Sequence, residues 1–400
     1  MPILTRWGAV AALLIAGVIA ALQIGKASIA LPALQRELVL TLSVASWVVG
    51  AYGMLGALAG LPAGVMSSLF TARKTLLAGM LVAGLGSIAG AFADNGPLLI
   101  ATRIIEGTGF LAASLAIPRL LRAVTAPKDL EIVLPLFAAY LPTGSVIMML
   151  AGPQLMSFGW QALWIVNGAA ALLWLIVITR LKIEEPPVAG NPVRALLPNV
   201  RAVLGAPGPI LLALCFGTYT FQYMALAGLL PTLLVDRMGL SIAAAGVISS
   251  ITVIANAIGN MSAGVLLRLG LPMWAIAIGA FTFVGLAGFG IFSGTMPVIA
   301  VAVLASASLG LTGMIPGSIY ATAPKFAPTS ALLAIALGLI NQTTNMGNLL
   351  GPSVTALVVD AFGWDRVPLL FAAVGVAGIS WALLLRRVLR RGSAVPKVNS

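Results

Sequence analysis

The chain of 400 residues contains no histidine, a single cysteine and few charged residues, which make up 8% of the sequence. Without histidine, the chain cannot build a His-ligated metal site, a histidine proton relay or a His-activated nucleophile. The lone Cys215 allows no internal disulfide. Soluble domains carry about 25% charged residues, so this composition excludes a large soluble core. We expect neither a bound metal nor a cofactor.

Hydrophobic residues make up 60% of the sequence, and the mean hydropathy is +1.09. They form long unbroken runs. A bilayer admits only helices or closed barrels, and runs of this length favour helices. The sequence therefore predicts an all-α membrane protein whose 12 transmembrane helices contact a lipid bilayer. The expected spans are residues 8–31, 43–66, 74–93, 98–121, 131–154, 161–181, 208–234, 241–267, 272–292, 297–320, 331–358 and 366–388.

The net charge of +12 is that of many nucleic-acid-binding proteins. Most of the basic residues, however, lie in short loops between apolar runs, where they orient transmembrane helices. Loops on the side of the N-terminus hold 17 Lys and Arg, and the opposite loops hold 3. This asymmetry predicts that both termini are cytoplasmic, that the protein lies in the inner (plasma) membrane, and that nucleic acid is not a partner.

The longest link between apolar runs, residues 182–207, divides the chain into two similar halves. Short sequences recur about 200 residues apart: Leu150–Pro153 as Leu349–Pro352, and Gly159-Trp160 as Gly363-Trp364. The predicted organisation is two pseudo-symmetric six-helix bundles, a cytoplasmic linker and a basic cytoplasmic tail. The bounds are 1–181 for the N-terminal bundle, 182–207 for the linker, 208–388 for the C-terminal bundle and 389–400 for the tail. Parallel repeats place a binding site between them, near the bilayer midplane.

Three charged side chains lie inside apolar runs: Lys26, Arg103 and Glu106. A charge at membrane depth costs about 2.5–3.5 kcal/mol on insertion scales, and intramembrane charges usually carry function. We interpret Arg103 and Lys26 as binding an anionic group of a substrate, and Glu106 as the proton carrier. The alternative is that Arg103 and Glu106, three residues apart on one helix face, neutralise each other as a fixed brace while Lys26 extends to the membrane surface.

The C-terminal half has polar rather than charged positions inside its spans. Tyr219, Gln222 and Tyr223 share one face of a helix, which would suit an aromatic platform for a substrate. A second polar cluster, Asn341, Gln342 and Asn345, lies in the run 331–358. We treat both sets as candidate substrate contacts. The alternative is ordinary hydrogen bonding between helices, which contributes about 0.6–2 kcal/mol per bond in membranes.

The sequence Arg103-x-x-Glu106-Gly107-x-Gly109 resembles the fourth-span motif of the major facilitator superfamily. Gly64 and Arg73 fit the superfamily's loop after span two, although Ser68 and Leu69 replace its Asp-Arg pair. Gly152-Pro153 is similar to the core of its antiporter motif, and Gly351-Pro352 repeats it. The resemblance implies that spans 1, 4, 7 and 10 line a central cavity, and that these glycines, prolines and Arg73 act in gating.

Together these features predict a secondary active transporter that moves a small organic solute, anionic or zwitterionic, by alternating access with proton coupling. We expect it to be a monomer and not an enzyme. The alternative within the same superfamily is a proton-driven efflux pump for drugs or metabolites, with cationic or neutral lipophilic substrates. A membrane enzyme would need clustered acids for Mg²⁺ or a nucleophile system, and a sensor would carry a soluble output domain.

Overall fold

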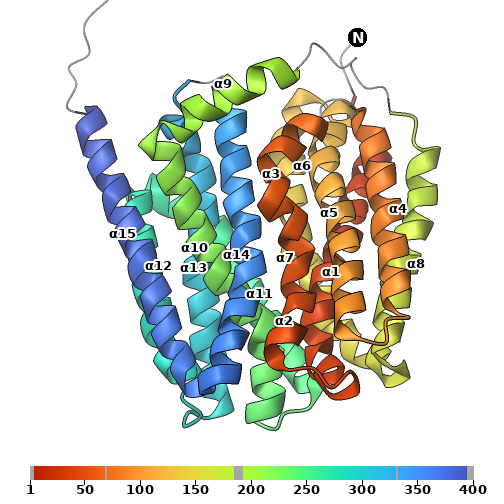
Figure 1. Ribbon diagram of the computed structural model, residues 1–400. Helices are drawn as coiled ribbons and strands as arrows, with labels where there is room; N and C mark the ends of the chain where they lie inside the picture. The colour runs from red at the N-terminus through yellow and green to blue at the C-terminus, as the bar shows by residue number, and fades with distance from the viewer. Residues whose placement is uncertain (1–3, 68–69, 184–191, 330–331, 394–400) are drawn as a thin grey trace, which may run out of the picture.

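The computed structural model describes residues 4–67, 70–183, 192–329 and 332–393, and these residues form helices with no strand. The helices run between two faces of the molecule (Figure 1). We call the face at which the first helix begins the N-terminal face. The all-helical prediction is confirmed for these residues. It follows from the bilayer, in which every backbone N–H and C=O needs a partner within its own segment.

The N-terminal helices closely follow the predicted spans, with two of them broken. Their bounds are α1 (Trp7–Glu37), α2 (Leu42–Gly50), η1 (Ala51–Gly53), α3 (Met54–Ser67), α4 (Ala72–Gly90), α5 (Gly96–Val124), η2 (Pro127–Asp129), α6 (Leu130–Ala138), α7 (Tyr140–Leu155), η3 (Met156–Phe158) and α8 (Trp160–Arg180). The second predicted span is divided by the 3-10 turn η1 and by Ala59, whose φ of −128° and ψ of 16° leave the helical region. The fifth is divided at Ala139.

The C-terminal helices include one that the sequence did not predict. Their bounds are α9 (Pro192–Leu204), α10 (Pro207–Thr232), the π-helical η4 (Leu233–Arg237), α11 (Ile242–Arg268), α12 (Met273–Ile291), α13 (Val298–Phe326), α14 (Leu333–Phe362), η6 (Trp364–Arg366) and α15 (Val367–Ser393). Helix α9 occupies half of the predicted linker. It lies along the N-terminal face (Figure 1) and packs against α3, α10 and α14.

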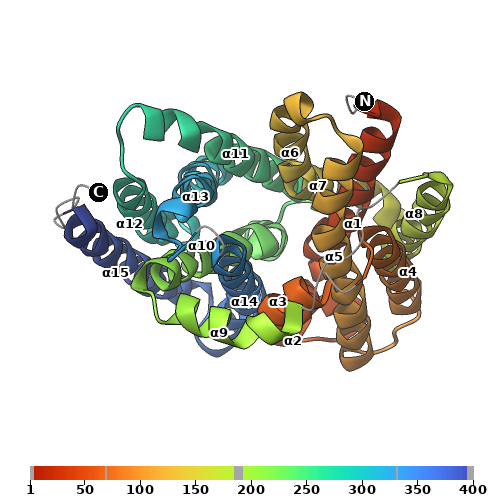
Figure 2. The same ribbon diagram turned by 90° about the horizontal axis from the view of Figure 1, so that it is seen from above.

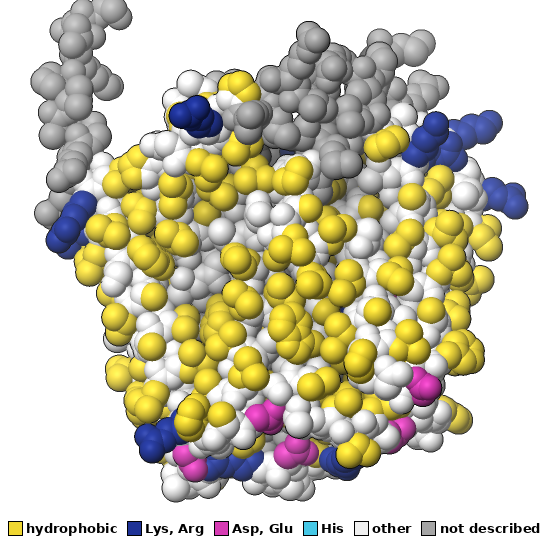
Figure 3. All heavy atoms as spheres, in the orientation of Figure 1, with side chains coloured by type: hydrophobic (Ala, Val, Ile, Leu, Met, Phe, Trp, Pro, Cys, Tyr) yellow, Lys and Arg dark blue, Asp and Glu magenta, His cyan; other side chains and the backbone are white. Residues whose placement is uncertain are grey.

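Ten helical segments of the described residues are long and apolar enough to cross a membrane. The fifth and eleventh predicted spans are not among them. The fifth is the broken α6–α7 pair, and the eleventh, α14, carries a polar stretch from Asn341 to Asn348. On the face that Figure 3 shows, hydrophobic side chains cover the middle of the molecule, and charged ones gather at its two ends. An apolar belt of this extent marks a multi-pass membrane protein.

The helices fall into two groups that lie side by side (Figure 2). Helices α1 to α8 pack among themselves, chiefly α4 on α5 and α1 on α7, and α10 to α15 do the same, chiefly α10 on α14 and α11 on α13. Between the groups, α2 and α3 pack on α14, α7 packs on α11, and α1 packs on α10.

Candidate functional site

Lys26, Arg103 and Glu106 meet in the interior of the N-terminal group; we call them the triad. Lys26 Nζ lies 3.0 Å from Glu106 Oε2, and Arg103 Nη1 donates to the same oxygen. Each of the three side chains has 0% of its surface exposed. Helices α1 and α5 thus bring the three charges together.

Two neighbouring helices hold Lys26 in place. Its ammonium group donates to Ser87 Oγ of α4 at 2.6 Å, and that hydroxyl donates to the Trp164 carbonyl of α8 at 2.6 Å. The ammonium also lies 4.6 Å from the centre of the Trp164 ring, a distance at which a cation is attracted to an aromatic face. Lys26 therefore points into the helix group and does not extend to the membrane surface, as the alternative interpretation required.

Arg103 is held by the broken second span. Its Nε donates to the Val48 carbonyl at 2.8 Å, and its guanidinium carbon lies 4.8 Å from the centre of the Tyr52 ring. The Tyr52 hydroxyl in turn donates to the Ala20 carbonyl at 3.0 Å. A Cβ at Gly107 would overlap the Tyr52 carbonyl oxygen. Only glycine at this position lets η1 come close enough to cover the arginine.

The triad has a formal charge of +1, because one carboxylate faces two cations. Arg103 Nη2 and Glu106 Oε1 have no hydrogen-bond partner among the described residues, although both are buried. The sequence led us to expect that solvent and solute reach these charges. In this conformation they are closed off, and the ion pair matches the fixed brace of the alternative interpretation. Access to a solute therefore requires a second conformation.

The three residues predicted to form a platform on α10 do not point to one place. The Tyr219 hydroxyl donates to Asn256 Oδ1 of α11 at 3.2 Å, and the Tyr219 and Tyr223 rings are 5.8 Å apart. Gln222 Nε2 donates to the Phe371 carbonyl of α15 at 3.0 Å. Gln222 thus joins two helices of the C-terminal group, while the tyrosines pair with each other.

The polar cluster of α14 lies at the interface between the two groups. Gln342 Nε2 donates to the Ala57 carbonyl at 3.0 Å, and its Oε1 accepts from the Leu61 N–H at 3.4 Å. Asn345 Nδ2 donates to the Asn341 carbonyl at 2.8 Å, and the Asn345 side chain lies against Gly56 of α3. These residues face the broken second span from the side opposite to Arg103. They contact no member of the triad.

The motif residues pack helices closely. Cβ atoms at Gly109, Gly152 and Gly351 would overlap Gly79 of α4, Ile29 of α1 and Phe221 of α10 respectively. The two copies of the Gly-Pro motif, Gly152-Pro153 in α7 and Gly351-Pro352 in α14, thus face α1 and α10 in equivalent positions. Their predicted role in gating remains a hypothesis.

The loop motif after the second span has two predicted residues, Gly64 and Arg73. Arg73 Nη2 donates to the Thr179 carbonyl at 2.8 Å, which ties α4 to the end of α8. Gly64 lies in α3, and residues 68 and 69 of the same motif lie outside the described residues.

The sequence reasoning missed the residues that position the triad: Ser87, Trp164, Tyr52 and the Val48 carbonyl. A serine in an apolar helix and an aromatic residue near a span end are common, so neither gave a signal. Their proximity to the charges depends on how α4 and α8 rotate in the group. No group of three or more Cys, Asp or Glu side chains that could hold a metal ion occurs in the described part of the chain.

Comparison with models of protein families shows the family of this chain. A model of the Major Facilitator Superfamily matches residues 13–341. The chain belongs to the Major Facilitator Superfamily. Major Facilitator Superfamily proteins are transporters, and the multi-pass helical fold agrees with this membership.

The names of individual relatives indicate different substrates. The chain is 27% identical to the 3-(3-hydroxy-phenyl)propionate transporter of Escherichia coli over 85% of this chain and 84% of that protein. It is 28% identical to the lincomycin resistance protein of Streptomyces lincolnensis over 53% of this chain and 43% of that protein. The fold is similar to that of a bacterial homologue of the human lysosomal transporter Spinster, with a TM-score of 0.80 at 13% identity, covering 96% of this chain and 97% of that one.

Proposed function

We propose that this protein is a secondary active transporter that moves a small organic anion together with a proton across the inner membrane. The main support for the proposal is the buried triad, in which one carboxylate oxygen of Glu106 binds donor groups of two cations. A structural ion pair needs one cation for one anion. The additional cation leaves the site ready to accept an anionic group, which would neutralise a charge that is costly at membrane depth.

The coupling follows from competition for the same donors. While Glu106 is ionised, its Oε2 occupies both Lys26 Nζ and Arg103 Nη1. Protonation of Glu106 weakens both contacts and frees those donors for a substrate carboxylate, which the planar guanidinium group suits. Tyr52 is the other titratable side chain facing Arg103. Proton binding and anion binding therefore favour each other, so substrate affinity should be higher when Glu106 is protonated.

The substrate class that we favour is an aromatic carboxylate. Aromatic rings continue from the triad, with Tyr52 4.8 Å from Phe110 and Phe110 6.2 Å from Tyr140. On the C-terminal group, Phe216 lies 5.7 Å from Tyr219 and 5.4 Å from Tyr320. Such rings suit an aromatic ring of a solute. The relative named for 3-(3-hydroxy-phenyl)propionate supports this choice, because that solute joins an aromatic ring to a carboxylate.

Movement of the two groups would be linked to the triad through residues Val48–Gly53. Arg103 binds the Val48 carbonyl and covers Tyr52 on one side of this segment. On its other side, Gly50 and Gly53 pack against the backbone of α14 at Leu349 and Asn345. Release of Arg103 from Glu106 thus acts directly on a segment that touches the opposite group. This supports alternating access by rocking of two six-helix bundles.

The membrane topology that goes with this mechanism has twelve crossings in a monomer. Helices α2 and α3 together form the second crossing, and α6 and α7 together form the fifth. The basic loops on the N-terminal face support a cytoplasmic location for both termini. Residues 1–181 and 208–388 would form the two bundles, α9 would lie in the cytoplasmic linker, and 389–400 would form the basic tail.

The deciding experiment uses purified protein in proteoliposomes with 3-phenylpropionate as the first probe, after a thermal-shift screen of carboxylates, nucleobases, vitamins and cationic dyes. Uptake should accelerate when the outside is acidified, and each solute should carry a proton inward. Glu106→Gln should bind solute independently of pH and lose the response to the gradient. Unchanged gradient dependence in this variant would remove Glu106 from the mechanism.

A second candidate function is efflux of lipophilic drugs, which the similarity to the lincomycin resistance protein favours. The same screen separates the two. An efflux pump would be stabilised by the cationic dyes, and substrate binding would then release protons. Stabilisation by carboxylates alone would exclude efflux of cationic drugs.

A further inference from the structure

Two carboxylates of the C-terminal group bind the N-terminal group at the face opposite to the N-terminal face. Asp360, near the end of α14, accepts a hydrogen bond from the backbone N–H of Ser43 in α2 at 2.8 Å. Asp236 of η4 lies 3.7 Å from Arg36 of α1, measured from Oδ1 to Nη2. Helix α2 packs on α14 at this face (Figure 1). Neither contact has a part in the binding of solute or proton proposed above.

Of these two contacts, the one with Asp360 is the stronger, because Ser43 lies in the first turn of a helix. The first N–H groups of a helix have no partner within it, and its N-terminus attracts an anion. The Thr41 hydroxyl accepts from the Val44 N–H at 3.3 Å, and Asp360 accepts from the Ser43 N–H. In the other contact, the Arg36 and Asp236 side chains are 63% and 39% exposed, and an exposed ion pair contributes little to stability.

Helix α2 connects the Asp360 contact to the triad. Ser43 lies in its first turn, and Val48, whose carbonyl accepts from Arg103 Nε at 2.8 Å, lies in its last turn. The five residues from Ser43 to Val48 correspond to about 7.5 Å along the helix axis. An anion thus lies at the positive end of this short helix and a cation near its negative end, as the helix dipole favours. The C-terminal group binds one end of α2, and the N-terminal group binds the other.

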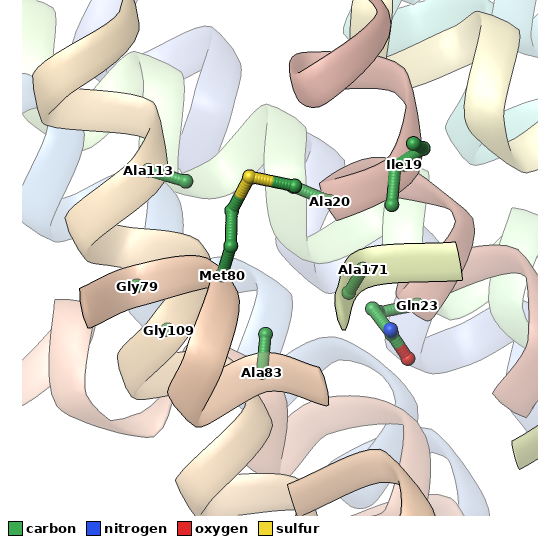
Figure 4. A pocket seen from close by; sticks show the side chains of 9 residues that line it. All are labelled: Ile19, Ala20, Gln23, Gly79, Met80, Ala83, Gly109, Ala113 and Ala171. Carbon is green, nitrogen blue, oxygen red and sulfur yellow. The ribbon is translucent and has the colours of Figure 1, made fainter. Parts of the chain in front are cut away.

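Each group is held together internally. A cavity between α1, α4, α5 and α8 of the N-terminal group has a volume of only about 10 Å³ and an apolar accessible lining (Figure 4). In the C-terminal group, Arg237 donates to the Phe292 carbonyl at 2.7 Å and pairs with Asp365, which holds η4 and therefore Asp236 in place. Close-packed groups move as units, so the contacts between the groups are the ones that must break.

We propose that Asp360 keeps the opposite face closed by binding the first turn of α2, and that this contact breaks each time the face opens. The inference rests on the proposed function, because it requires the two groups to rock. Asp360 is a positioning residue. It binds Ser43 and acts on the triad only through α2, whose Val48 carbonyl holds Arg103. Because the contact stabilises the closed arrangement alone, its loss shifts the population toward the open one.

The test measures the populations of the open and closed face without a solute. Spin labels are attached at Asp94→Cys and Thr295→Cys, exposed loop positions of the two groups at this face. The labelled protein carries Cys215→Ala and is studied in nanodiscs by double electron–electron resonance. Asp360→Ala should raise the ratio of open to closed about fivefold, which corresponds to about 1 kcal/mol for the loss of a helix cap. Asp360→Asn should stay within about twofold of the wild type, because asparagine also caps helices.

Asp365→Ala is the matched control. Asp365 is another exposed acid at this face, but its partner Arg237 belongs to the same group, so the ratio should stay at the wild-type value. Arg36→Gln should raise the ratio at most about twofold, because its ion pair is exposed. A second measurement is hydrogen exchange of the peptide that contains Ser43, which should be faster in Asp360→Ala and unchanged in Asp365→Ala.

The outcomes separate this inference from the proposed function. An unchanged ratio or an unchanged exchange rate in Asp360→Ala would overturn the inference and leave the rocking of the two groups intact. A single label distance in the wild type and in every variant, with and without 3-phenylpropionate, would instead exclude the rocking motion and therefore the proposed function.

Discussion

The charge arrangement of the triad predicts unequal effects on stability when its members are neutralised one at a time. Lys26→Met leaves Arg103 paired with Glu106, a neutral couple, and removes the formal charge of +1. Glu106→Gln leaves two buried cations, Lys26 and Arg103, without a counter-charge. Both side chains are fully buried in the wild type, so solvent screens neither change.

The magnitudes follow from the geometry. At 3.0 Å and an effective dielectric constant of about 20, the attraction between Lys26 and Glu106 is about 5 kcal/mol. Removing the anion of a buried pair costs about 3–5 kcal/mol, because the cation stays behind without its solvation. Lys26→Met forfeits this attraction, together with the Ser87 hydrogen bond and the Trp164 contact, about 2–5 kcal/mol for these last two, but it relieves the repulsion between Lys26 and Arg103. It also removes the desolvation cost of a buried ammonium group, so the net loss should stay within about 1 kcal/mol.

The measurement is the free energy of unfolding in mixed micelles, taken from SDS titrations of the wild type, both single variants and the double variant. The double variant leaves one unpaired cation, and its stability should fall between those of the two single variants. Lys74→Met, at an exposed lysine of α4, should change stability by less than about 0.5 kcal/mol. If Lys26→Met destabilises the protein as much as Glu106→Gln does, the triad carries no excess positive charge and the reasoning from its two cations is refuted.

Three further predictions concern Gly107, Arg103 and Gln222. Gly107→Ala should destabilise the protein by about 1–3 kcal/mol, because the new methyl group overlaps the Tyr52 carbonyl oxygen, whereas Gly264→Ala, with open space around it, should have no such effect in the same unfolding assay. Arg103→Lys should reduce transport at least about tenfold, since a single ammonium nitrogen cannot reproduce the planar fork in which Nε binds Val48 while Nη1 binds Glu106; wild-type transport rates would contradict the role of the guanidinium fork. Gln222→Leu should lower stability by about 1 kcal/mol and leave the KM for solute within about twofold, because its amide joins α10 to α15; a much higher KM would return Gln222 to the substrate site.

The predicted helix boundaries were good where a single apolar run makes a single helix, and poor where tertiary packing alters the run. Helix α1 continues to Glu37, whereas the predicted span ends at residue 31, because a polar helix end can extend beyond the apolar core without losing its hydrogen bonds. The break at η1 was not predicted. Tyr52 and Gly53 carry no strong helix-breaking signal, and the break meets Arg103 on one side and α14 on the other. Helix α9 was missed because its sequence, with Pro192 and Pro198, favours a linker.

The candidate site was predicted in part. Lys26, Arg103 and Glu106 were identified because a charge in an apolar run is a local feature with a known cost. Helical spacing indicated the contact between Arg103 and Glu106, whereas the contact of Lys26 with Glu106 depends on how α1 packs on α5. The platform on α10 was predicted from the same spacing rule, yet Gln222 faces α15 while Tyr219 faces Asn256 of α11. Helical spacing shows which residues share a helix face, but one face can contact more than one neighbouring helix.

The sequence by itself determined that this chain is a multi-pass helical membrane protein of the Major Facilitator Superfamily with three charges in its interior. These properties follow from composition and from short motifs, because burial in lipid is decided segment by segment. Only the tertiary structure decided that Ser87 and Trp164 receive Lys26, that Val48 and Tyr52 receive Arg103, and that the triad is closed in this conformation. Those contacts depend on how each helix is rotated against its neighbours, and that rotation is set by the packing of the whole group.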